Sequence, residues 1–179
     1  LISRCPTVLP WGASLFYNTN HGEREYWNPL FWQSMIRLSG TNRLGEIDFS
    51  AMAVRIKPKY ALWCFPQCYG GGFAERMGKG VSIGFSENSR SAVTYSFFID
   101  GSAHAFIPVL FGQVSRDGRK KADTDLDSII SVQEAFTYAS RRDPMTQPYM
   151  ALTPWKNTYH LYYQNANPAS ISFDVGSEK

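Results

Sequence analysis

One stretch, residues 60–73, constrains the fold of this chain more than any other. It reads Tyr-Ala-Leu-Trp-Cys-Phe-Pro-Gln-Cys-Tyr-Gly-Gly-Gly-Phe. Its first six residues are apolar, rich in aromatics and uncharged, and Pro58 precedes them, which predicts a buried strand over Tyr60–Phe65. Cys68 follows directly, beside Gly70–Gly72, which lack the Cβ atom that keeps other backbone away. We therefore expect a thiol at the tip of a buried strand; the alternative is a cysteine near a flexible glycine turn.

The residues before this strand predict a crossover connection. An earlier strand is expected over Ala13–Asn18, because that run is also apolar and rich in aromatics. A helix is expected over residues 48–57, with Asp48 as its cap and Pro58 as its end. Its apolar residues recur at helical spacing: Phe49, Met52, Ala53 and Ile56. Strand, helix and strand form a βαβ unit with parallel strands, so the fold class is α/β.

Two residues with useful chemistry follow the two predicted strands. His21 comes shortly after the first strand and is followed by Gly22, while Cys68 comes shortly after the second. In open α/β sheets, ligands bind beyond the carboxyl ends of the strands. The two residues are 47 positions apart, close to the ~50-residue His-to-Cys separation of caspases. The pattern therefore favours a nucleophilic site made by an imidazole and a thiol.

Taken together, the His-Gly and Gln-Cys-x-Gly-Gly motifs resemble those of the caspase-like (clan CD) cysteine peptidases. The resemblance is closest to the legumain-like and bacterial branches and runs from about Ser14 to about Pro154. It implies a three-layer sandwich with a mainly parallel sheet, a small hairpin after the His-Gly motif, and cysteine endopeptidase activity on peptide or protein substrates. Cys68 would be the nucleophile, and His21 would give a proton to the leaving amine. The backbone N–H groups of Gly22 and Cys68 would hold the oxyanion.

The resemblance also implies a pocket for the substrate residue before the cut. A third strand is expected over Val81–Phe85, and the segment after it lines this pocket in the family. The expected substrate-binding residues are Gln67, Ser86, Glu87 and Asn88. Glu87 could select a basic or an amide side chain such as Asn. The alternative is that Glu87 pairs with Arg90 at the surface.

Two departures from the family pattern affect the function. Gly70 stands where many relatives have Ser after the nucleophile. Pro66 stands where relatives that cut after Arg or Lys commonly have an acid. These departures support a second hypothesis, a catalytically silent caspase-like module that binds a peptide or a protein partner. A third hypothesis is an unrelated α/β domain in which His21 and Cys68 are coincidental.

A loop near residue 123 fits the template of a calcium site. Loop positions 1, 3, 5 and 12 are acidic: Asp123, Asp125, Asp127 and Glu134. Ser128 stands where such loops have Gly, which makes the sharp turn costlier. The alternative is structural: Ser131 and Glu134 would form a capping box that opens a helix over residues 132–139. Related bacterial sequences look similar here, so calcium is the one cofactor considered, and none is required.

Composition narrows the class of protein. A chain of 179 residues with 44% hydrophobic residues can form one globular domain. A net charge of +3 is too small to indicate nucleic-acid binding, and no apolar run is long enough to span a membrane. Cys5, Cys64 and Cys68 lack the spacing of a zinc site, and three cysteines cannot all pair. A reducing compartment such as the cytoplasm is therefore expected.

The resemblance predicts that the sheet is incomplete at its N-terminal side. In relatives two further strands precede the His-Gly strand, whereas about a dozen irregular residues precede it here, so residues 1–179 match the C-terminal two-thirds of the family fold. We expect a partner chain, a cleaved N-terminal segment or residues outside this sequence to cover the flank of Ala13–Asn18. Further elements are expected as helices over 73–79 and 103–111 and as edge strands over 159–163 and 171–174.

Overall fold

The computed structural model describes residues 7–8, 13–18, 20–56, 58–93, 106–112, 122–142 and 158–173. The chain divides into two compact units. The first comprises residues 1–94 and 158–166, and the second comprises residues 95–157 and 167–179. Among the described residues, no helix is both long enough and apolar enough to cross a membrane.

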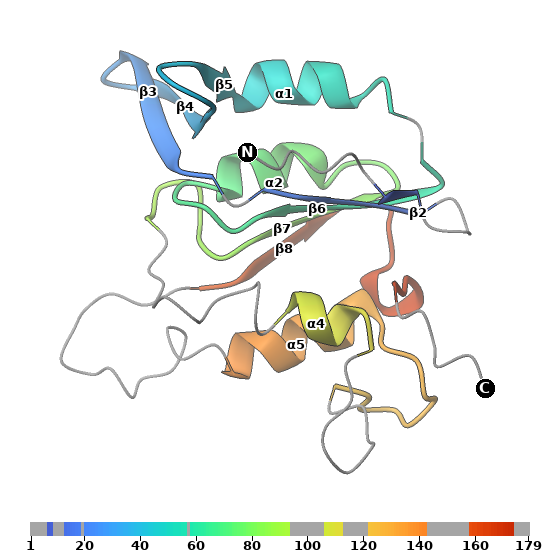
Figure 1. Ribbon diagram of the computed structural model, residues 1–179. Helices are drawn as coiled ribbons and strands as arrows, with labels where there is room; N and C mark the ends of the chain where they lie inside the picture. Colours follow the sequence, from blue (N-terminus) through green and yellow to red (C-terminus); the bar gives the residue numbers. More distant parts are fainter. Residues whose placement is uncertain are drawn as a thin grey trace, which may run out of the picture. The chain divides into compact units, whose positions relative to one another are not determined.

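A mixed sheet forms the centre of the first unit (Figure 1). Its strand order is β1-β2-β6-β7-β8, with the bounds Thr7–Val8, Ala13–Tyr17, Tyr60–Phe65, Ser82–Ser86 and His160–Tyr163. The β2–β6 and β6–β7 pairs are parallel, and the outer pairs, β1–β2 and β7–β8, are antiparallel. The α/β class and the parallel pairing of the two predicted strands are therefore confirmed.

A second, antiparallel sheet is formed by the residues that follow β2 in the sequence and precede the first helix. It contains β3 (Gly22–Asn28), β4 (Phe31–Arg37) and β5 (Arg43–Gly45), in that order. The β3–β4 turn is closed by Asn28, whose Oδ1 accepts hydrogen bonds from the N–H groups of Leu30 and Phe31 at 2.8 and 3.0 Å. Asn is favoured in turns for this reason. The hairpin expected after His21 and Gly22 is confirmed.

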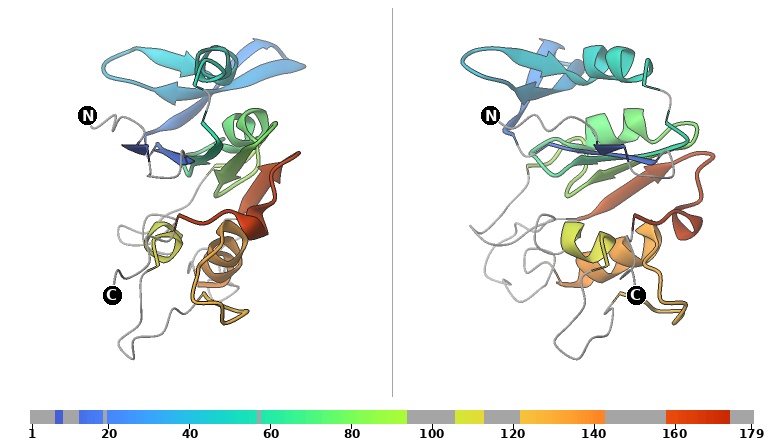
Figure 2. Two further views of the ribbon diagram at one scale, coloured as in Figure 1. Left: turned by 90° about the vertical axis from the view of Figure 1, so that its right-hand side faces the viewer. Right: turned by 45° about the vertical axis from the view of Figure 1, so that its right-hand side comes forward.

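Two helices lie on one face of the mixed sheet (Figures 1 and 2). Helix α2 (Gly71–Met77) packs against β6, β7 and β8, and helix α1 (Glu46–Ala53) packs against α2 and β4. The prediction of a helix over 48–57 is wrong at both ends. The helix begins at Glu46 with Gly45 as its N-cap, so Asp48 does not cap it.

The buried face of α1 explains this shift. Its buried residues are Glu46, Phe49 and Ala53, whereas Met52 and Ile56, which we expected on that face, are 52% and 44% exposed. The predicted face assumed that the helix continues to Pro58. The helix instead ends at Ala53, and the next residues make shorter-range hydrogen bonds. The N–H of Ile56 bonds to the carbonyl three residues earlier, that of Ala53, at 2.9 Å.

Aromatic side chains fill the space between the helices and the mixed sheet. The Phe49 ring lies 5.2 Å from Phe16, 5.9 Å from Trp63 and 5.4 Å from Phe65. Phe65 in turn stacks on Phe73 of α2 at 5.1 Å. The five residues that follow Tyr60 in β6 are all buried, on both faces of the strand, as expected for the interior strand of a parallel sheet.

The described part of the second unit contains two helices and a short 3-10 turn. Helix α5 (Val132–Arg142) packs against α4 (Ile107–Leu110) and η3 (Pro168–Ser170). The predicted helix over 103–111 is shorter than expected. Pro108 lies in its first turn, where the missing N–H costs nothing.

Two further elements differ from their predicted form or bounds. The predicted strand over 171–174 is wrong within the described residues, because Ser172 makes only an isolated bridge with Ser131. The predicted helix over 73–79 is found two residues earlier, as α2. Cys5, His104, Thr153 and Pro154 lie outside the described residues.

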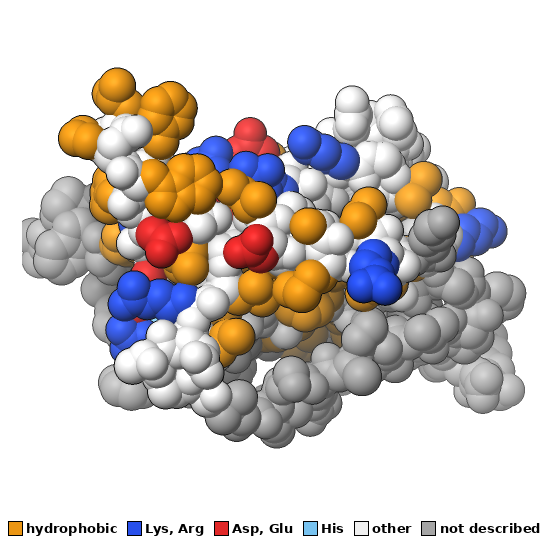
Figure 3. All heavy atoms as spheres, turned by 90° about the horizontal axis from the view of Figure 1, so that it is seen from above, with side chains coloured by type: hydrophobic (Ala, Val, Ile, Leu, Met, Phe, Trp, Pro, Cys, Tyr) orange, Lys and Arg blue, Asp and Glu red, His pale blue; other side chains and the backbone are white. Residues whose placement is uncertain are grey.

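Apolar side chains are also exposed on the outer side of α1 and on the β3–β4 hairpin. Figure 3 looks down on this face and shows apolar side chains among charged ones. The most exposed near the hairpin turn are Tyr26, Trp27, Leu30 and Phe31, and those on and after α1 include Met52 and Val54. Of the four aromatic residues in β3 and β4, which are Tyr26, Trp27, Phe31 and Trp32, only Trp32 is partly buried.

Candidate active site

The register of the parallel strands brings the two candidate catalytic segments to one edge of the sheet. Strands β2 and β6 pair from Ala13 opposite Tyr60 to Tyr17 opposite Cys64. The N–H of Asn18 continues this ladder to the carbonyl of Cys64 at 3.1 Å. His21 and Cys68 each come four residues after the last paired position, so both leave the sheet at the same end.

Backbone contact between the two segments is shown at Gly22. A Cβ atom placed on Gly22 would collide with the carbonyl oxygen of Cys68 and lie 3.0 Å from Cγ of Gln67. No other residue type fits there without a backbone shift. The His-Gly segment and the Cys68 turn are therefore in van der Waals contact through their main chains.

The surroundings of His21 and Cys68 suit a site that solvent can reach. His21 is exposed; its N–H donates to Oδ1 of Asn20 at 3.2 Å, and its carbonyl accepts the N–H of Arg37 at 2.9 Å. Cys68 is half-buried in a turn that is closed by the N–H of Gly70 on the carbonyl of Gln67 at 2.9 Å. The structure thus places His21, Gly22 and Cys68 in one neighbourhood.

Among the predicted substrate-binding residues, Gln67 is the one whose buried side chain has polar atoms unpaired within the described part of the chain. Its side chain is 7% exposed, and neither Oε1 nor Nε2 has a hydrogen-bond partner among the described residues. Buried amide groups nearly always have partners, so this pair of atoms is unusual. Gln67 precedes Cys68 and touches the position of Gly22.

The predicted pocket segment, Ser86–Asn88, is buried and bonded within the chain. Ser86 Oγ donates to the carbonyl of Asn88 at 2.8 Å, and the Asn88 amide bonds the carbonyl of Val93 and the N–H of Thr158. Glu87 is 3% exposed. The alternative that Glu87 forms a surface pair with Arg90 is therefore wrong, and Arg90 forms an ion pair with Glu46 instead.

A cluster of arginines and aromatic rings beside Cys68 was not predicted from the sequence. The guanidinium carbon of Arg24 lies 4.3 Å from the ring centroid of Tyr69 and 4.8 Å from that of Trp32. Arg90 lies 5.3 Å from the Trp32 ring. Trp32 lies in β4, and the sequence pattern gives no sign of which cations contact it.

A buried carboxylate lies beneath this cluster. Glu46 is fully buried and pairs with Arg76, at 3.1 Å between Nε and Oε1, and with Arg90. Its Oε2 accepts the N–H of Ser34 at 3.3 Å. A Cβ atom on Gly72 would collide with this carboxylate, so α2 approaches α1 closely only because residue 72 is glycine.

The other thiol and histidine that the structure describes, Cys64 and His160, are poorer catalytic candidates. Cys64 is fully buried in β6, and burial raises the pKa of its thiol well above the usual value, which makes it a weak nucleophile. His160 in β8 is partly buried, and this burial lowers its pKa. Its ring stacks on Tyr162 at 5.8 Å.

The acidic loop of the second unit brings together three of the four residues predicted to bind calcium. Ligand oxygens of Asp123, Asp125 and Glu134 lie within 4.8 Å of one another, but Asp127 is not in this cluster. Ser128 has a φ of 70°, the left-handed conformation for which glycine is usual at this loop position. Oδ1 of Asp123 is buried without a partner among the described residues.

The capping box is confirmed. The N–H of Glu134 donates to Ser131 Oγ at 3.2 Å, and the N–H of Ser131 donates to Oε2 of Glu134 at 3.0 Å. Oε1 of Glu134 also accepts two bonds from Thr124. Burial raises the pKa of Glu134, but these hydrogen bonds outweigh it and lower the pKa overall. Calcium binding stays a prediction, to be measured as a shift in melting temperature in millimolar calcium.

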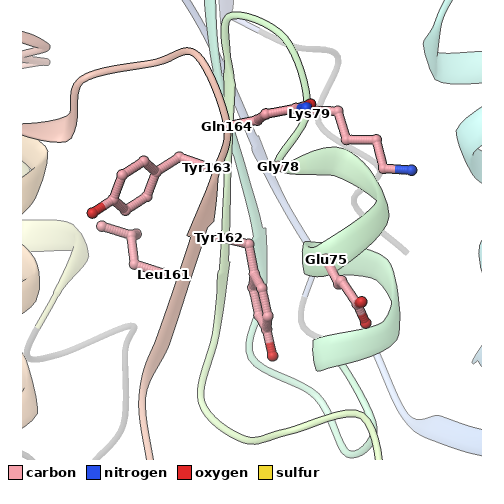
Figure 4. A pocket seen from close by; sticks show the side chains of 7 residues that line it. All are labelled: Glu75, Gly78, Lys79, Leu161, Tyr162, Tyr163 and Gln164. Atoms are coloured by element: carbon pink, nitrogen blue, oxygen red, sulfur yellow. The ribbon is translucent and has the colours of Figure 1, made fainter.

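A pocket between the end of α2 and β8 contains none of the predicted site residues (Figure 4). Figure 4 shows Tyr162 and Glu75 on one side of β8, with Leu161 and Tyr163 on the other. Burial, and then Glu75, raise the pKa of Tyr162, while a hydrogen bond with Ser86 and the charge of Arg90 oppose the rise. The pocket gives no argument for a second site.

Comparisons with known proteins add no further constraint. No protein-family model, no curated protein and no solved structure matches the chain.

Proposed function

We propose that the protein is a cysteine endopeptidase of the caspase-like type, with Cys68 and His21 as its catalytic dyad. One observation carries the proposal: the backbone of Gly22 touches that of Cys68 at the edge where β2 and β6 both end. This contact brings an imidazole-bearing segment and a thiol-bearing turn together from residues 47 positions apart. Such a pair is the minimum that thiol-dependent cleavage of a peptide bond requires.

The proposed reaction has two halves. The Cys68 sulfur gives up its proton to His21 and attacks the carbonyl carbon of the substrate, and the N–H groups of Gly22 and Cys68 stabilise the oxyanion. The C–N bond breaks as His21 gives its proton to the leaving amine. Water then attacks the thioester, which releases the acid product and restores the thiol.

Substrate selection is proposed to involve Gln67 and the segment Ser86–Asn88. The unpartnered amide of Gln67 supports this, because a substrate could supply the hydrogen bonds that the described residues do not. Glu87 carries the proposed preference for a basic residue or Asn before the cut. Its burial means that a substrate side chain would have to enter the interior to reach it.

The finer fold proposal is a three-layer caspase-like sandwich whose sheet is completed by another segment. Strand β1 supports it, since it pairs with β2 only at Ser14 and Leu15 and leaves the rest of that edge without a described strand. A partner chain or a cleaved N-terminal segment would pair there. A catalytic thiol also favours a reducing compartment such as the cytoplasm.

The decisive experiment is covalent labelling with a peptidyl acyloxymethyl ketone. The native chain should be labelled at Cys68, identified by mass spectrometry of the modified peptide. Cys68→Ala should abolish labelling, and His21→Ala should slow it by about 100-fold or more. The matched control is Cys64→Ala, which removes the buried thiol and should not reduce labelling. Equal labelling of the native chain and Cys68→Ala would sink the peptidase proposal.

The alternative is a catalytically silent caspase-like module that binds a peptide or protein. The internal hydrogen bonds of Ser86 and Asn88 favour it, because they occupy groups that a substrate pocket would use. Under this alternative the ketone would not label Cys68, yet a peptide would bind with an affinity that Gln67→Ala weakens.

A further inference from the structure

The residue directly after the proposed nucleophile has an unusual backbone conformation. Tyr69 has a φ of 58°, in the left-handed region that bulky L-residues rarely adopt. Such a conformation persists only when surrounding contacts hold it. Two backbone bonds contribute: the N–H of Tyr69 donates to the carbonyl of Ala92 at 2.9 Å, and its carbonyl accepts the N–H of Gly72 at 3.2 Å.

The side chain of Tyr69 is held by Arg24. The guanidinium of Arg24 lies over the Tyr69 ring at 4.3 Å and contacts the Trp32 ring at 4.8 Å. Its two terminal nitrogens are also fixed, one by the Tyr26 hydroxyl at 3.0 Å and the other by the carbonyl of Ser91. A guanidinium fixed by two rings and two hydrogen bonds has little freedom to move away from Tyr69.

Arg24 also belongs to the segment that carries His21. It lies in β3, two residues after Gly22, and it is paired with Ser34 across the hairpin. The Arg24–Tyr69 contact therefore joins the two halves of the site: the His21–Gly22 segment on one side and the Cys68 turn on the other. The backbone contact between Gly22 and Cys68 lies between the same two segments.

We propose that Arg24 is a positioning residue that clamps Tyr69 and so fixes Cys68 against Gly22 and His21. The effect of this clamp on catalysis rests on the proposed peptidase function, whereas the contact between Arg24 and Tyr69 does not. Arg24 touches no reacting atom; it sets where the thiol and the oxyanion N–H groups lie relative to each other. A displacement of about 1 Å between such groups can cost about 100-fold in rate.

The clamp is tested first by hydrogen exchange in the full 179-residue chain. Arg24→Gln and Tyr69→Ala should each speed exchange in residues 67–72 about tenfold, the equivalent of one cation–π contact. The double variant should exchange no faster than either single variant, because both substitutions remove the same contact. Tyr69→Phe keeps the ring face and should behave as the native chain. Arg24→Lys keeps a cation that can contact the ring but loses the planar fork, so its exchange rate should lie between those of the native chain and Arg24→Gln.

The positioning role is tested by comparing two reagents at Cys68. Iodoacetamide needs only an accessible thiolate, whereas the peptidyl acyloxymethyl ketone also needs the imidazole and the oxyanion N–H groups aligned with the sulfur. Arg24→Gln and Tyr69→Ala should lower the ratio of ketone to iodoacetamide rates by about 10- to 100-fold, and Tyr69→Phe should restore it. Melting curves show whether each variant stays folded.

The outcomes are distinguishable. An unchanged rate ratio in Arg24→Gln, or a loss that only tracks the unfolded fraction, overturns the positioning role. Additive effects of the two substitutions on exchange overturn the clamp. If the ketone fails to label the native chain at Cys68, the peptidase proposal fails, and the exchange experiment then decides alone whether Arg24 clamps Tyr69.

Discussion

Three non-glycine residues among those described adopt positive φ, and two of them lie in the acidic loop. Leu126 has a φ of 64° and Ser128 a φ of 70°. The left-handed region costs L-residues about 1–2 kcal/mol because Cβ approaches the following carbonyl oxygen. At Ser128 the calcium-loop template anticipates this conformation, whereas nothing in the sequence pattern anticipates it at Leu126. The strain at Leu126 gives a direct prediction.

Leu126→Asn should stabilise the protein. Asn tolerates the left-handed conformation, and the Leu126 side chain is 83% exposed, so little packing is lost. We expect the free energy of unfolding to rise by about 0.5–1 kcal/mol, measured by urea denaturation. Leu126→Ala is the matched control: it keeps the Cβ penalty and should change stability by less than about 0.5 kcal/mol. A stabilisation shared by both variants would contradict the explanation.

A pH-dependent prediction follows from Glu134. Its lowered pKa means that the unfolded chain takes up the proton first as pH falls, so its ionised form stabilises the fold above the unfolded pKa. Glu134→Gln keeps a side-chain acceptor for Ser131 but removes a negative charge from the first turn of α5, so it should cost about 0.3–1 kcal/mol at pH 7. The difference from the native chain should shrink as pH falls through the folded pKa of Glu134, followed by urea denaturation from pH 7 downward. A gap that does not change over this range would refute it.

At the scale of elements, the packing of α1 against α2 depends on a charge. The first residue of α1, Glu46, is fully buried and bonded to Arg76 and Arg90. The two arginines come from α2 and from the loop after β7, so one carboxylate links three segments of the first unit. Hydrophobic periodicity cannot predict that Glu46 is buried, because it assigns buried positions from the spacing of apolar residues alone.

Glu46→Gln should therefore be strongly destabilising. Removing one partner from a buried ion pair typically costs about 3–5 kcal/mol, but the two arginines here are partly exposed and can regain water, so about 2–3 kcal/mol is expected. Asp48→Asn is the matched control, since Asp48 is an exposed acid in the same helical turn. It should change the free energy of unfolding by less than about 0.5 kcal/mol. Equal effects in urea denaturation would argue against the network.

At the scale of the molecule, the proposal that another segment completes the mixed sheet concerns the outer edge of β2. Among the described residues, β1 is the only strand on this edge of β2, and it pairs with Ser14 and Leu15 alone. An exposed strand edge offers unpaired N–H and carbonyl groups to any other strand. The described C-terminal strand, β8, pairs at the opposite side of the sheet, with β7, and so does not protect this edge.

The isolated 179-residue chain should therefore associate through this edge. Sedimentation velocity at increasing concentration should show a growing share of species larger than the monomer, because strand pairing between chains would satisfy the edge. A supplied partner strand should suppress this association. A chain that remains monomeric at all concentrations would contradict the proposal that another segment completes the sheet.

The local sequence pattern was sufficient to predict the elements that bury continuous apolar runs. The aromatic run at 60–65 became β6 with the predicted bounds, and the crossover placed it parallel to β2. The capping box of Ser131 and Glu134 was also found. Each depends on residues close together in the sequence, either a continuous apolar run or a pair three positions apart, or on the order of strand, helix and strand along the chain. A single sequence carries both kinds of information.

The amino-acid sequence by itself determined the α/β class, the two parallel strands and the candidate pair His21 and Cys68. Only the tertiary structure decided what surrounds that pair. The clamp of Arg24 on Tyr69 and the buried Glu46 each join residues from separate elements. Contacts of this kind depend on how elements pack in three dimensions, and their residues have no fixed spacing along the chain. For that reason no sequence motif could have named them.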